Sequence, residues 1–175
     1  LTYSVVGGAD ADKFNIDSSS GALTFKSAPD YENPADVSSP PDNVYEVQIQ
    51  ADDSNGGTAT QTVSVTVSNA NEAPSFTSTA PTSVPENTSG TIYTASASDP
   101  DAGDTVTFSI DPSSTDADDF SITANGALSF QSPPDFEDEQ DADQDNTYVV
   151  GLVATDGGGA TATQTVTVSV ADISA

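Results

Sequence analysis

Apolar and polar residues alternate along several short segments of the chain, and this pattern predicts strands. The alternating apolar positions are Tyr45, Val47, Ile49, Val63, Val65, Val67, Val166, Val168 and Val170. A period of two in segments rich in Val, Thr and aromatic residues is typical of half-buried strands. No segment carries apolar residues at helical spacing over three turns, and turn-forming residues recur about every ten positions. We therefore expect an all-β fold made of β-sandwich domains, each with roughly seven strands and about 100 residues.

The strand pattern is repeated once along the chain. The segment Leu1–Val5 matches Val106–Ile110 at an offset of 105 positions, and Thr58–Val63 recurs residue for residue as Thr161–Val166 at an offset of 103. A period near 100 residues is longer than that of solenoid repeats, so each copy should have its own core. We expect two tandem domains, residues 1–71 and 72–175.

Large apolar residues at matching positions should form the two cores. The expected core residues are Phe14, Leu23, Phe25 and Tyr45 in the first copy, and Phe108, Phe120, Leu128, Phe130 and Tyr148 in the second. The remaining aromatic residues Tyr31, Phe76, Tyr93 and Phe136 do not fit the alternation and are expected to be available on the surface.

The charge of the chain restricts its partners. The sequence has 28 Asp and Glu residues against Lys13 and Lys26 alone, which gives a net charge of −26. Such a surface repels nucleic acid and anionic lipid. Cys, His, Met and Trp are absent, so the chain lacks the thiolate and imidazole groups that most nucleophilic, acid–base and zinc sites use. No apolar run is long enough for a membrane span. We expect a protein that is not an enzyme, does not bind nucleic acid and does not insert into a membrane. Because the chain begins on a strand-like segment without Met, we also expect it to be part of a longer protein.

Two acidic triplets belong to the repeat. Asp30-Tyr31-Glu32 and Asp135-Phe136-Glu137 lie 105 positions apart, each after the same kind of strand pair. Two carboxylates about 5 Å apart repel each other by roughly 3 kcal/mol at an effective dielectric constant of about 20, so a repeated set of acids suggests a cation. Oxygen ligands of this kind suit Ca²⁺ better than Mg²⁺, which needs stricter octahedral geometry. Scattered acids such as Asp10 and Asp12 could equally serve only solubility.

The acidic positions resemble those of tandem cadherin domains, in the form found in large bacterial surface proteins and adhesins. Pro85-Glu86-Asn87 is similar to the Pro-Glu-Asn before the first strands of many cadherin repeats, and Ala97–Asp101 is similar to the Ala-x-Asp-x-Asp of the family. The triplets resemble its Asp-Arg-Glu, with an aromatic residue in place of Arg. Ala154-Thr155-Asp156 resembles its Ala-x-Asp, and Asn69–Pro74 resembles its linker Asp-x-Asn-Asp-Asn-x-Pro.

The resemblance implies two Greek-key, immunoglobulin-like sandwiches, the first lacking its N-terminal strand, with Ca²⁺ held at the junction between consecutive domains. The junction ligands that it implies are Asp30, Glu32, Asn69, Asn71 through its carbonyl, Glu72, Asp99, Asp101 and Asp156. Half of a second site would consist of Glu86, Asp135, Glu137 and Asp172. Asn69 stands where the family has Asp, which implies fewer or more weakly held ions than at a complete cadherin junction.

The acidic loop Asp141–Asn146 imitates the first half of an EF-hand. Asn146 replaces the Gly expected at position six of such a loop, and Leu152 replaces the Glu expected at position twelve, so this motif is rejected. A solvated acidic loop and an additional, loop-stiffening calcium ion remain as alternatives.

The resemblance implies an extracellular or cell-surface location and a calcium-rigidified extender or adhesion module. Its partners would be neighbouring cadherin-like domains of the same chain, together with a cell-surface protein or polysaccharide. A calcium-dependent carbohydrate-binding module of a secreted polysaccharide-handling protein is the alternative. Against it, sugar platforms rely on exposed aromatic residues, and this chain has no Trp.

Overall fold

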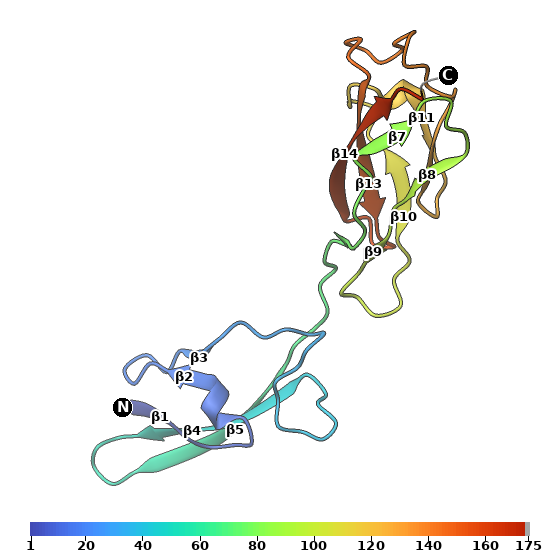
Figure 1. Ribbon diagram of the computed structural model, residues 1–175. Coiled ribbons are helices and arrows are strands. Elements are labelled where there is room, and N and C mark those ends of the chain that lie inside the picture. The colour runs from blue at the N-terminus through green and yellow to red at the C-terminus, as the bar shows by residue number, and fades with distance from the viewer. Residues whose placement is uncertain (174–175) are drawn as a thin grey trace. The chain divides into compact units, whose positions relative to one another are not determined.

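The computed structural model describes residues 1–173 and divides the chain into two compact units, Leu1–Ala70 (unit 1) and Asn71–Ala175 (unit 2). Apart from two short 3₁₀ turns, all regular structure in the described residues is strand (Figure 1). This confirms the all-β expectation. No helix in the described part of the chain has the length and apolarity that crossing a bilayer would need.

Unit 1 contains five strands and one 3₁₀ turn. They are β1 (Thr2–Gly7), η1 (Ala11–Lys13), β2 (Phe14–Ile16), β3 (Leu23–Phe25), β4 (Val44–Asp52) and β5 (Thr58–Thr66). Strands β1, β4 and β5 form one antiparallel sheet in the order β1-β4-β5, and β2 pairs with β3.

Unit 2 contains nine strands and one 3₁₀ turn. They are β6 (Ser75–Phe76), β7 (Ser83–Pro85), β8 (Thr91–Thr94), β9 (Ala97–Ser98), β10 (Thr107–Ile110), η2 (Ala117–Asp119), β11 (Phe120–Ile122), β12 (Ala127–Phe130), β13 (Thr147–Thr155) and β14 (Thr161–Ala171). The sheets are β10-β13-β14-β7, β11-β12-β8 and the short pair β6-β9, and β7 runs parallel to β14.

The repeat in the sequence is reproduced in strand register. Tyr3 on β1 lies opposite Ala51 on β4, and their counterparts Phe108 on β10 and Ala154 on β13 are paired in the same way. Strands β1 to β5 of unit 1 therefore have the pairing of β10 to β14 in unit 2. The alternating Val and Tyr residues explain this register, because a one-residue slip would turn every core side chain to the solvent face.

The same aromatic trio packs at the centre of each unit. In unit 1 the rings of Phe14 and Phe25 stack with centroids 4.6 Å apart, and Tyr45 meets Phe25 edge-on at 5.1 Å. In unit 2 the corresponding distances are 4.6 Å for Phe120–Phe130 and 5.0 Å for Phe130–Tyr148. All nine expected core residues are buried in a core cluster or packed against one.

The expectation for the remaining aromatic residues was wrong for all but one of them. Tyr93 is buried in the core of unit 2, and Phe76 and Phe136 pack against that core. Tyr31 alone of the four is exposed. The short strands β6 and β8, which the alternation did not reveal, place Phe76 and Tyr93. Unit 2 therefore lacks the surface platform of these rings on which sugar binding would depend.

For Asp10, the structure rules out the alternative that the residue serves only solubility. Its side chain is 2% exposed and accepts hydrogen bonds from the backbone N–H groups of Val37 and Glu46, both at 2.8 Å. Asp116 is the counterpart in unit 2, also 2% exposed, and accepts from the N–H groups of Ala142 and Val149. Each of these carboxylates precedes a 3₁₀ turn. It connects that turn to the loop before the long strand, which is β4 in unit 1 and β13 in unit 2, and to the long strand itself.

Candidate metal centre

Three carboxylates from separate segments meet at one end of unit 2. Thr107, the first residue of β10, lies opposite Thr155, the last residue of β13. This pairing places Asp104 before β10 beside Asp156 after β13, and Asp99, which follows β9, joins them. One oxygen from each of these three side chains lies within 4.8 Å of the others. We refer to Asp99, Asp104 and Asp156 as the first acidic cluster.

Asp156 is buried and fully engaged in hydrogen bonds. It accepts from Asn71 Nδ2 at 3.0 Å and from the N–H groups of Gly159 and Ala160 at 2.5 and 2.8 Å. Burial acts to raise the pKa of Asp156, but the bonds from Asn71 and the loop amides outweigh it and lower the pKa below its usual value. The side chain is therefore held as a carboxylate. A side chain at Gly158 would overlap the carboxamide oxygen of Asn71, so the glycine leaves room for this contact.

Asp101 extends the cluster toward the start of unit 2. Its buried side chain accepts the N–H of Glu72 at 3.0 Å, and its own N–H donates to Asp99 Oδ1 at 2.9 Å. The structure thus gathers five of the predicted residues at one edge of unit 2: Asn71, Glu72, Asp99, Asp101 and Asp156.

Asp99 also supplies an oxygen whose hydrogen-bonding capacity is unused. Its Oδ2 is buried and has no hydrogen-bond partner among residues 1–173. A buried polar atom without a partner is costly, and an anionic oxygen beside two further carboxylates is costlier still. A cation at this position would satisfy it, so the residues present fit a metal site.

A second acidic cluster consists of Glu86, Asp135 and Glu137, whose ligand oxygens also lie within 4.8 Å of one another. Glu86 is buried, and the N–H groups of Ile173 at 2.9 Å and Phe136 at 3.2 Å lower its pKa. The pKa of Glu137 is raised, first by burial and then by the charge of Glu86. Asp172 adds to that charge, so the structure brings together all four residues predicted for the second site.

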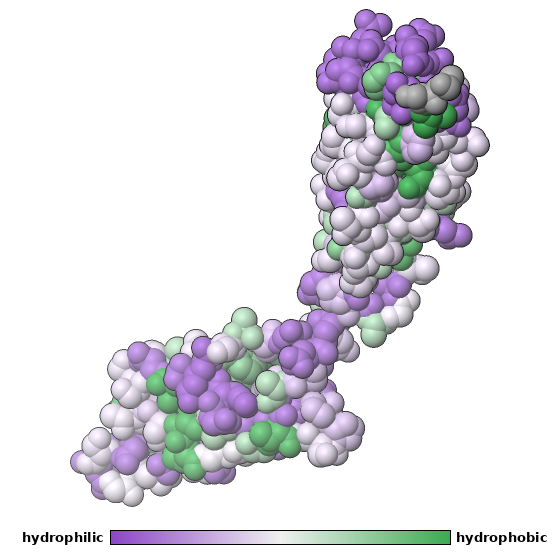
Figure 2. Space-filling view, in the orientation of Figure 1, coloured by the Kyte–Doolittle hydropathy of each residue, from purple (hydrophilic) through white to green (hydrophobic). Residues whose placement is uncertain are grey.

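The two clusters lie at opposite ends of the sheet. Strand β13 begins at Thr147 opposite Ser169, close to where β14 pairs with the end of β7 and leads to Glu86. It ends at Thr155, next to Asp156 of the first cluster. Nine extended residues separate the clusters, which corresponds to about 30 Å of strand. Figure 2 shows the hydrophilic residues of unit 2 gathered toward its two ends, with paler sides between them.

The predicted ligands in unit 1 have a simpler setting. Asp30 and Glu32 are exposed, and Asp30 Oδ1 accepts the N–H groups of Glu32 at 3.0 Å and Asn33 at 3.1 Å. The same turn occurs in unit 2, where Asp135 Oδ1 accepts the N–H of Glu137 at 3.1 Å. Asn69 is exposed and lies beyond the end of β5. The role of these three residues as ligands is taken up below as a proposal.

Sequence reasoning missed Asp104 as a member of the first cluster. The resemblance drew attention to Asp99, Asp101 and Asp156, but not to Asp104. The register of the repeated strands would have found it, because Asp104 immediately precedes the segment that must pair with the end of β13.

The acidic loop Asp141–Asn146 is ordered around one buried side chain. Asp141 is 3% exposed and accepts the N–H groups of Asp145 and Asn146, at 2.9 and 3.1 Å. In unit 1 Asp36 does the same with the N–H groups of Asp42 and Asn43. Asp143 and Asp145 are exposed and lie with Asp141 in a further group of carboxylates. Of the two alternatives for this loop, a fully solvated segment does not fit, because its first acid, Asp141, is buried.

Chemically, the clusters offer only oxygen atoms, and the chain has no His or Cys. Hard cations such as Ca²⁺ prefer carboxylate and carbonyl oxygens, of which they take six to eight in flexible geometry. No positively charged side chain occurs in unit 2, since both lysines belong to unit 1. Backbone N–H groups and a bound cation are therefore the means by which unit 2 can compensate its clustered charge.

Comparison with known proteins agrees with the fold. Human protocadherin-24 EC1-2 superposes with a TM-score of 0.64 at 26% identity, covering 98% of this chain and 82% of that one. Mouse cadherin-23 EC22-24 superposes with a TM-score of 0.56 at 25% identity, and the chain spans 53% of its length. The cadherin domain family matches residues 80–171. That match covers more than half of the sequence. It contains every residue of the first and the second acidic cluster. The chain accordingly belongs to the cadherin domain family.

Proposed function

We propose that the chain is a calcium-rigidified extender of a large bacterial surface protein, which holds an adhesive domain away from the cell. Cadherin domains are extracellular adhesion modules that typically bind Ca²⁺, and they are not enzymes. The bacterial setting rests on the resemblance of the sequence to the cadherin domains of large bacterial surface proteins. Residues 1–71 and 72–175 are the two proposed domains.

One observation carries the proposal: unit 2 has an oxygen cluster at each end of its sheet, and the first cluster contains a buried carboxylate oxygen without a partner. A module with a cation site at each end is suited to a linear array, because each ion can be shared with the next module. The family pattern assigns Asp30, Glu32 and Asn69 of unit 1 as further ligands of the ions that Asn71, Glu72, Asp99, Asp101 and Asp156 bind. That assignment rests on the sequence resemblance.

The residues of the first cluster have separate tasks in this proposal. Asp99 supplies the buried oxygen, and Asp104 supplies a more exposed one. Asp156 is held in place by Asn71 and the loop amides, so its carboxylate is oriented before an ion arrives. When bound, Ca²⁺ supplies the positive charge that neutralises these acids and can bridge segments on which they lie.

Calcium binding can be measured by titration calorimetry of the chain stripped with chelator. Calcium should bind, and at a concentration one hundredfold above its dissociation constant it should stabilise the fold by about 2.7 kcal/mol per site. Asp104→Asn should weaken binding to the first cluster while the circular dichroism spectrum stays that of a β-sheet. Asp118→Asn, which removes an exposed acid within η2, is the matched control and should bind calcium as the parent does. Equal melting temperatures with calcium and with chelator would contradict the calcium role.

The extender role is tested separately by small-angle scattering. Calcium should narrow the distribution of the maximum dimension, and chelator should broaden it, because repelling carboxylates then replace shared ligands. Asp101→Ala and Glu32→Ala should each reproduce the effect of chelator while both units stay folded. A profile that is equally narrow with and without calcium would show that calcium does not stiffen the chain.

A further inference from the structure

The two lysines of the chain come together in unit 1. Lys13 ends η1 and Lys26 follows β3, and the N–H of Lys26 donates to the carbonyl of Lys13 at 2.8 Å. Like charges on neighbouring backbone segments repel each other. With 28 acids in the sequence, lysines that served only to balance charge would be expected apart from each other. Their pairing concentrates all the positive side-chain charge at one place.

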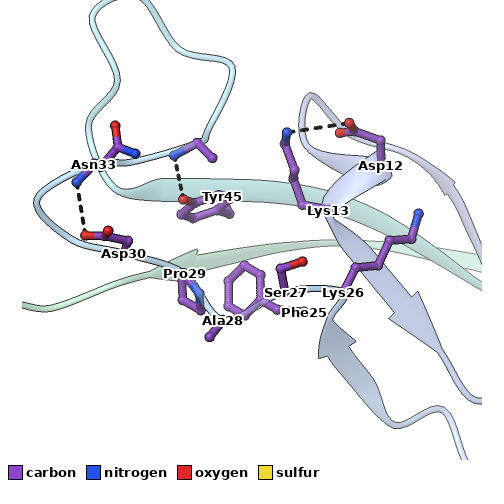
Figure 3. Close-up of a pocket in the computed structure, with 11 residues that line it drawn as sticks. Asp12, Lys13, Phe25, Lys26, Ser27, Ala28, Pro29, Asp30, Asn33 and Tyr45 are labelled. Atoms are coloured by element: carbon purple, nitrogen blue, oxygen red, sulfur yellow. Dashed lines mark hydrogen bonds and ion pairs between the residues drawn. The ribbon is translucent and has the colours of Figure 1, made fainter.

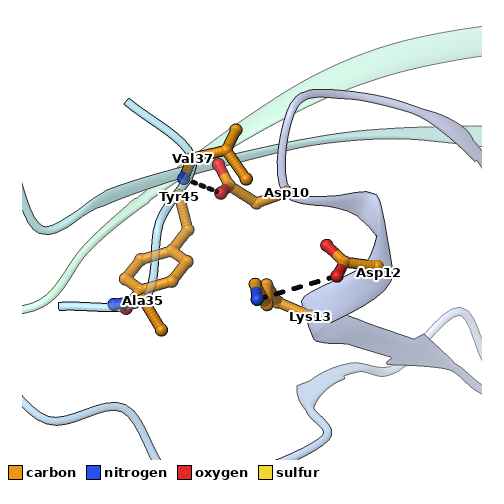
Figure 4. Close-up of polar contacts among 6 residues, drawn as sticks. All are labelled: Asp10, Asp12, Lys13, Ala35, Val37 and Tyr45. Carbon is orange, nitrogen blue, oxygen red and sulfur yellow. Dashed lines mark hydrogen bonds and ion pairs between the residues drawn. The ribbon is translucent and has the colours of Figure 1, made fainter. Parts of the chain in front are cut away.

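Both ammonium groups remain accessible to a ligand. Lys13 Nζ lies 3.6 Å from Asp12 Oδ2, whose side chain is 71% exposed (Figure 4). A surface ion pair of this kind contributes about 0–1 kcal/mol and can be exchanged for another anion. Lys26 is exposed and forms no ion pair with any residue in the described part of the chain.

The lysines line a pocket of about 460 Å³, which is within the usual size range for small-molecule sites. Phe25 and Pro29 form an apolar wall, and Tyr45 closes the inner side (Figure 3). The Tyr45 hydroxyl already accepts the N–H of Ala35 at 3.0 Å. Asn33 lies across the pocket from the two lysines (Figure 3). The pocket thus combines a side with the two lysines and Asp12, an apolar wall, and a far side with Asn33 and Asp30.

Unit 2 shows that the fold does not require these lysines. The same backbone bond joins Gln131 N–H to the carbonyl of Asp119 at 2.8 Å, so these residues occupy the positions of Lys26 and Lys13. The pKa of Asp119 is raised by burial and by the charge of Asp116, and Gln131 Nε2 donates to the carbonyl of Phe120 at 3.1 Å. With the same aromatic trio beneath, one unit has two cations and the other has none.

We propose that the pocket of unit 1 binds a carboxylate-bearing sugar, such as a hexuronic acid residue of a glycan. Its carboxylate would contact the ammonium groups of Lys13 and Lys26, and its ring would lie against the wall that includes Phe25. Its hydroxyl groups would reach Asn33. A protein carboxylate would use the lysines but would leave most of the pocket empty. Asp30 lines this pocket and is also a proposed calcium ligand, so the binding is tested in chelator, where the extender role does not operate.

Two-dimensional ¹H–¹⁵N spectra of the full chain in chelator test the proposal, with sodium galacturonate and sodium glucuronate as probes. Shifts should follow a saturable curve and fall on Lys13, Phe25, Lys26 and Asn33. The unit 2 counterparts Asp119, Phe130 and Gln131 are internal controls and should not move. Lys26→Gln introduces the residue that unit 2 has at this position, and it should weaken binding about tenfold or more, as expected for the loss of a charged hydrogen bond. The variant with both Lys13→Gln and Lys26→Gln should not bind.

Other probes separate the remaining possibilities. Galactose and glucose should bind at least tenfold more weakly than the uronates, because they lack the carboxylate. Acetate should also bind more weakly, because it lacks the ring. Equal binding of acetate, or unchanged binding to the double variant, would overturn the proposal. So would self-association in analytical ultracentrifugation that the double variant abolishes, since acids of a second copy would then be the occupant.

Discussion

At the scale of single residues, buried carboxylates that accept backbone N–H groups are the main polar feature of both units. Asp10 and Asp116 are each 2% exposed, and each accepts two backbone N–H groups from segments distant in sequence. Removing such an acceptor leaves buried N–H groups unsatisfied, which costs more than the loss of the bond itself. These acids therefore stabilise the fold, in contrast to the exposed acids near them.

Asp116→Asn should lower the free energy of unfolding by about 1–3 kcal/mol, because its amide nitrogen would face a backbone donor. Urea unfolding followed by circular dichroism measures the effect. Asp118→Asn, two residues away and exposed, is the control and should change stability by less than about 0.5 kcal/mol. Equal changes in the free energy of unfolding for the two substitutions would show that the hydrogen bonds of Asp116 do not stabilise the fold.

Asp36 gives unit 1 a predictable response to acid. Its pKa is lowered, chiefly by the hydroxyl of Ser38 and also by the N–H of Asn43, against the opposing effect of burial. A lowered pKa in the folded state means that this carboxylate adds stability above the ordinary pKa of Asp. That contribution is lost as the pH falls through the lower folded-state value.

The melting temperature in chelator, taken relative to that of Asp36→Asn, should therefore decline as the pH falls below about 4. Asp36→Asn should already be less stable at neutral pH and should show a shallower decline. Thermal melts at a series of pH values test this. A variant whose decline is as steep as that of the parent would show that Asp36 does not contribute to the acid response.

At the scale of strands, the two copies of the long central strand, β4 and β13, differ in how deeply their side chains are buried. Val47 and Val150 are both fully buried, but Leu152 and Ala154 on β13 are fully buried whereas Ile49 and Ala51 on β4 are only half-buried. Fewer buried apolar contacts around β4 imply that it opens more readily.

Native-state hydrogen exchange should show this difference directly. The amides of Ile49 and Ala51 should exchange faster than those of Leu152 and Ala154. The hydrogen bonds between strands have the same register in both copies, so the comparison isolates the effect of packing. Slower exchange in β4 than in β13 would contradict the explanation.

Strands and core residues were predictable where the alternation is long. Tyr45, Val47, Val166 and Val168 stand in runs of alternating residues, and all four are buried as expected. Strand β5 also alternates, but its inner face is only partly buried. Phe76 and Tyr93 were missed because β6 and β8 have only two and four residues, too few to establish a period. Short strands are located by their partners in the sheet, which the sequence does not show.

The acidic site was predictable to the extent that it follows local motifs. Asp99, Asp101 and Asp156 belong to such motifs, and the structure places them together. Asp104 does not, and it joins the cluster only because β10 pairs with β13. The buried acids Asp10 and Asp116 have the same cause, since their donors lie in distant segments. Sequence alone does not separate such acids from exposed ones.

At the scale of the whole molecule, net charge dominates the energetics. A charge of −26 with two cations makes mutual repulsion a general destabilising effect on the folded state. Sodium chloride screens exposed charges, with a Debye length of about 10 Å at 0.1 M and about 3 Å at 1 M.

Raising sodium chloride from 0.05 to 0.5 M in chelator should thus increase the melting temperature. Calorimetric scans at several salt concentrations measure the increase. The same series at about pH 3, where most carboxylates are protonated, should show a much smaller increase. A salt effect of equal size at both pH values would mean that repulsion between carboxylates is not its source.

The pairing of Lys13 and Lys26 also determines where the molecule can be tethered. Apart from the terminal amine of Leu1, these are the primary amines of the sequence, and both stand at the rim of one pocket. Reagents that acylate amines usually decorate a protein in many places. Here the side chains they reach are confined to one spot on unit 1, so a dye, a bead or a glass surface would be attached there. Molecules immobilised through these two side chains would be attached at one place on unit 1, which is what a single-molecule pulling measurement needs.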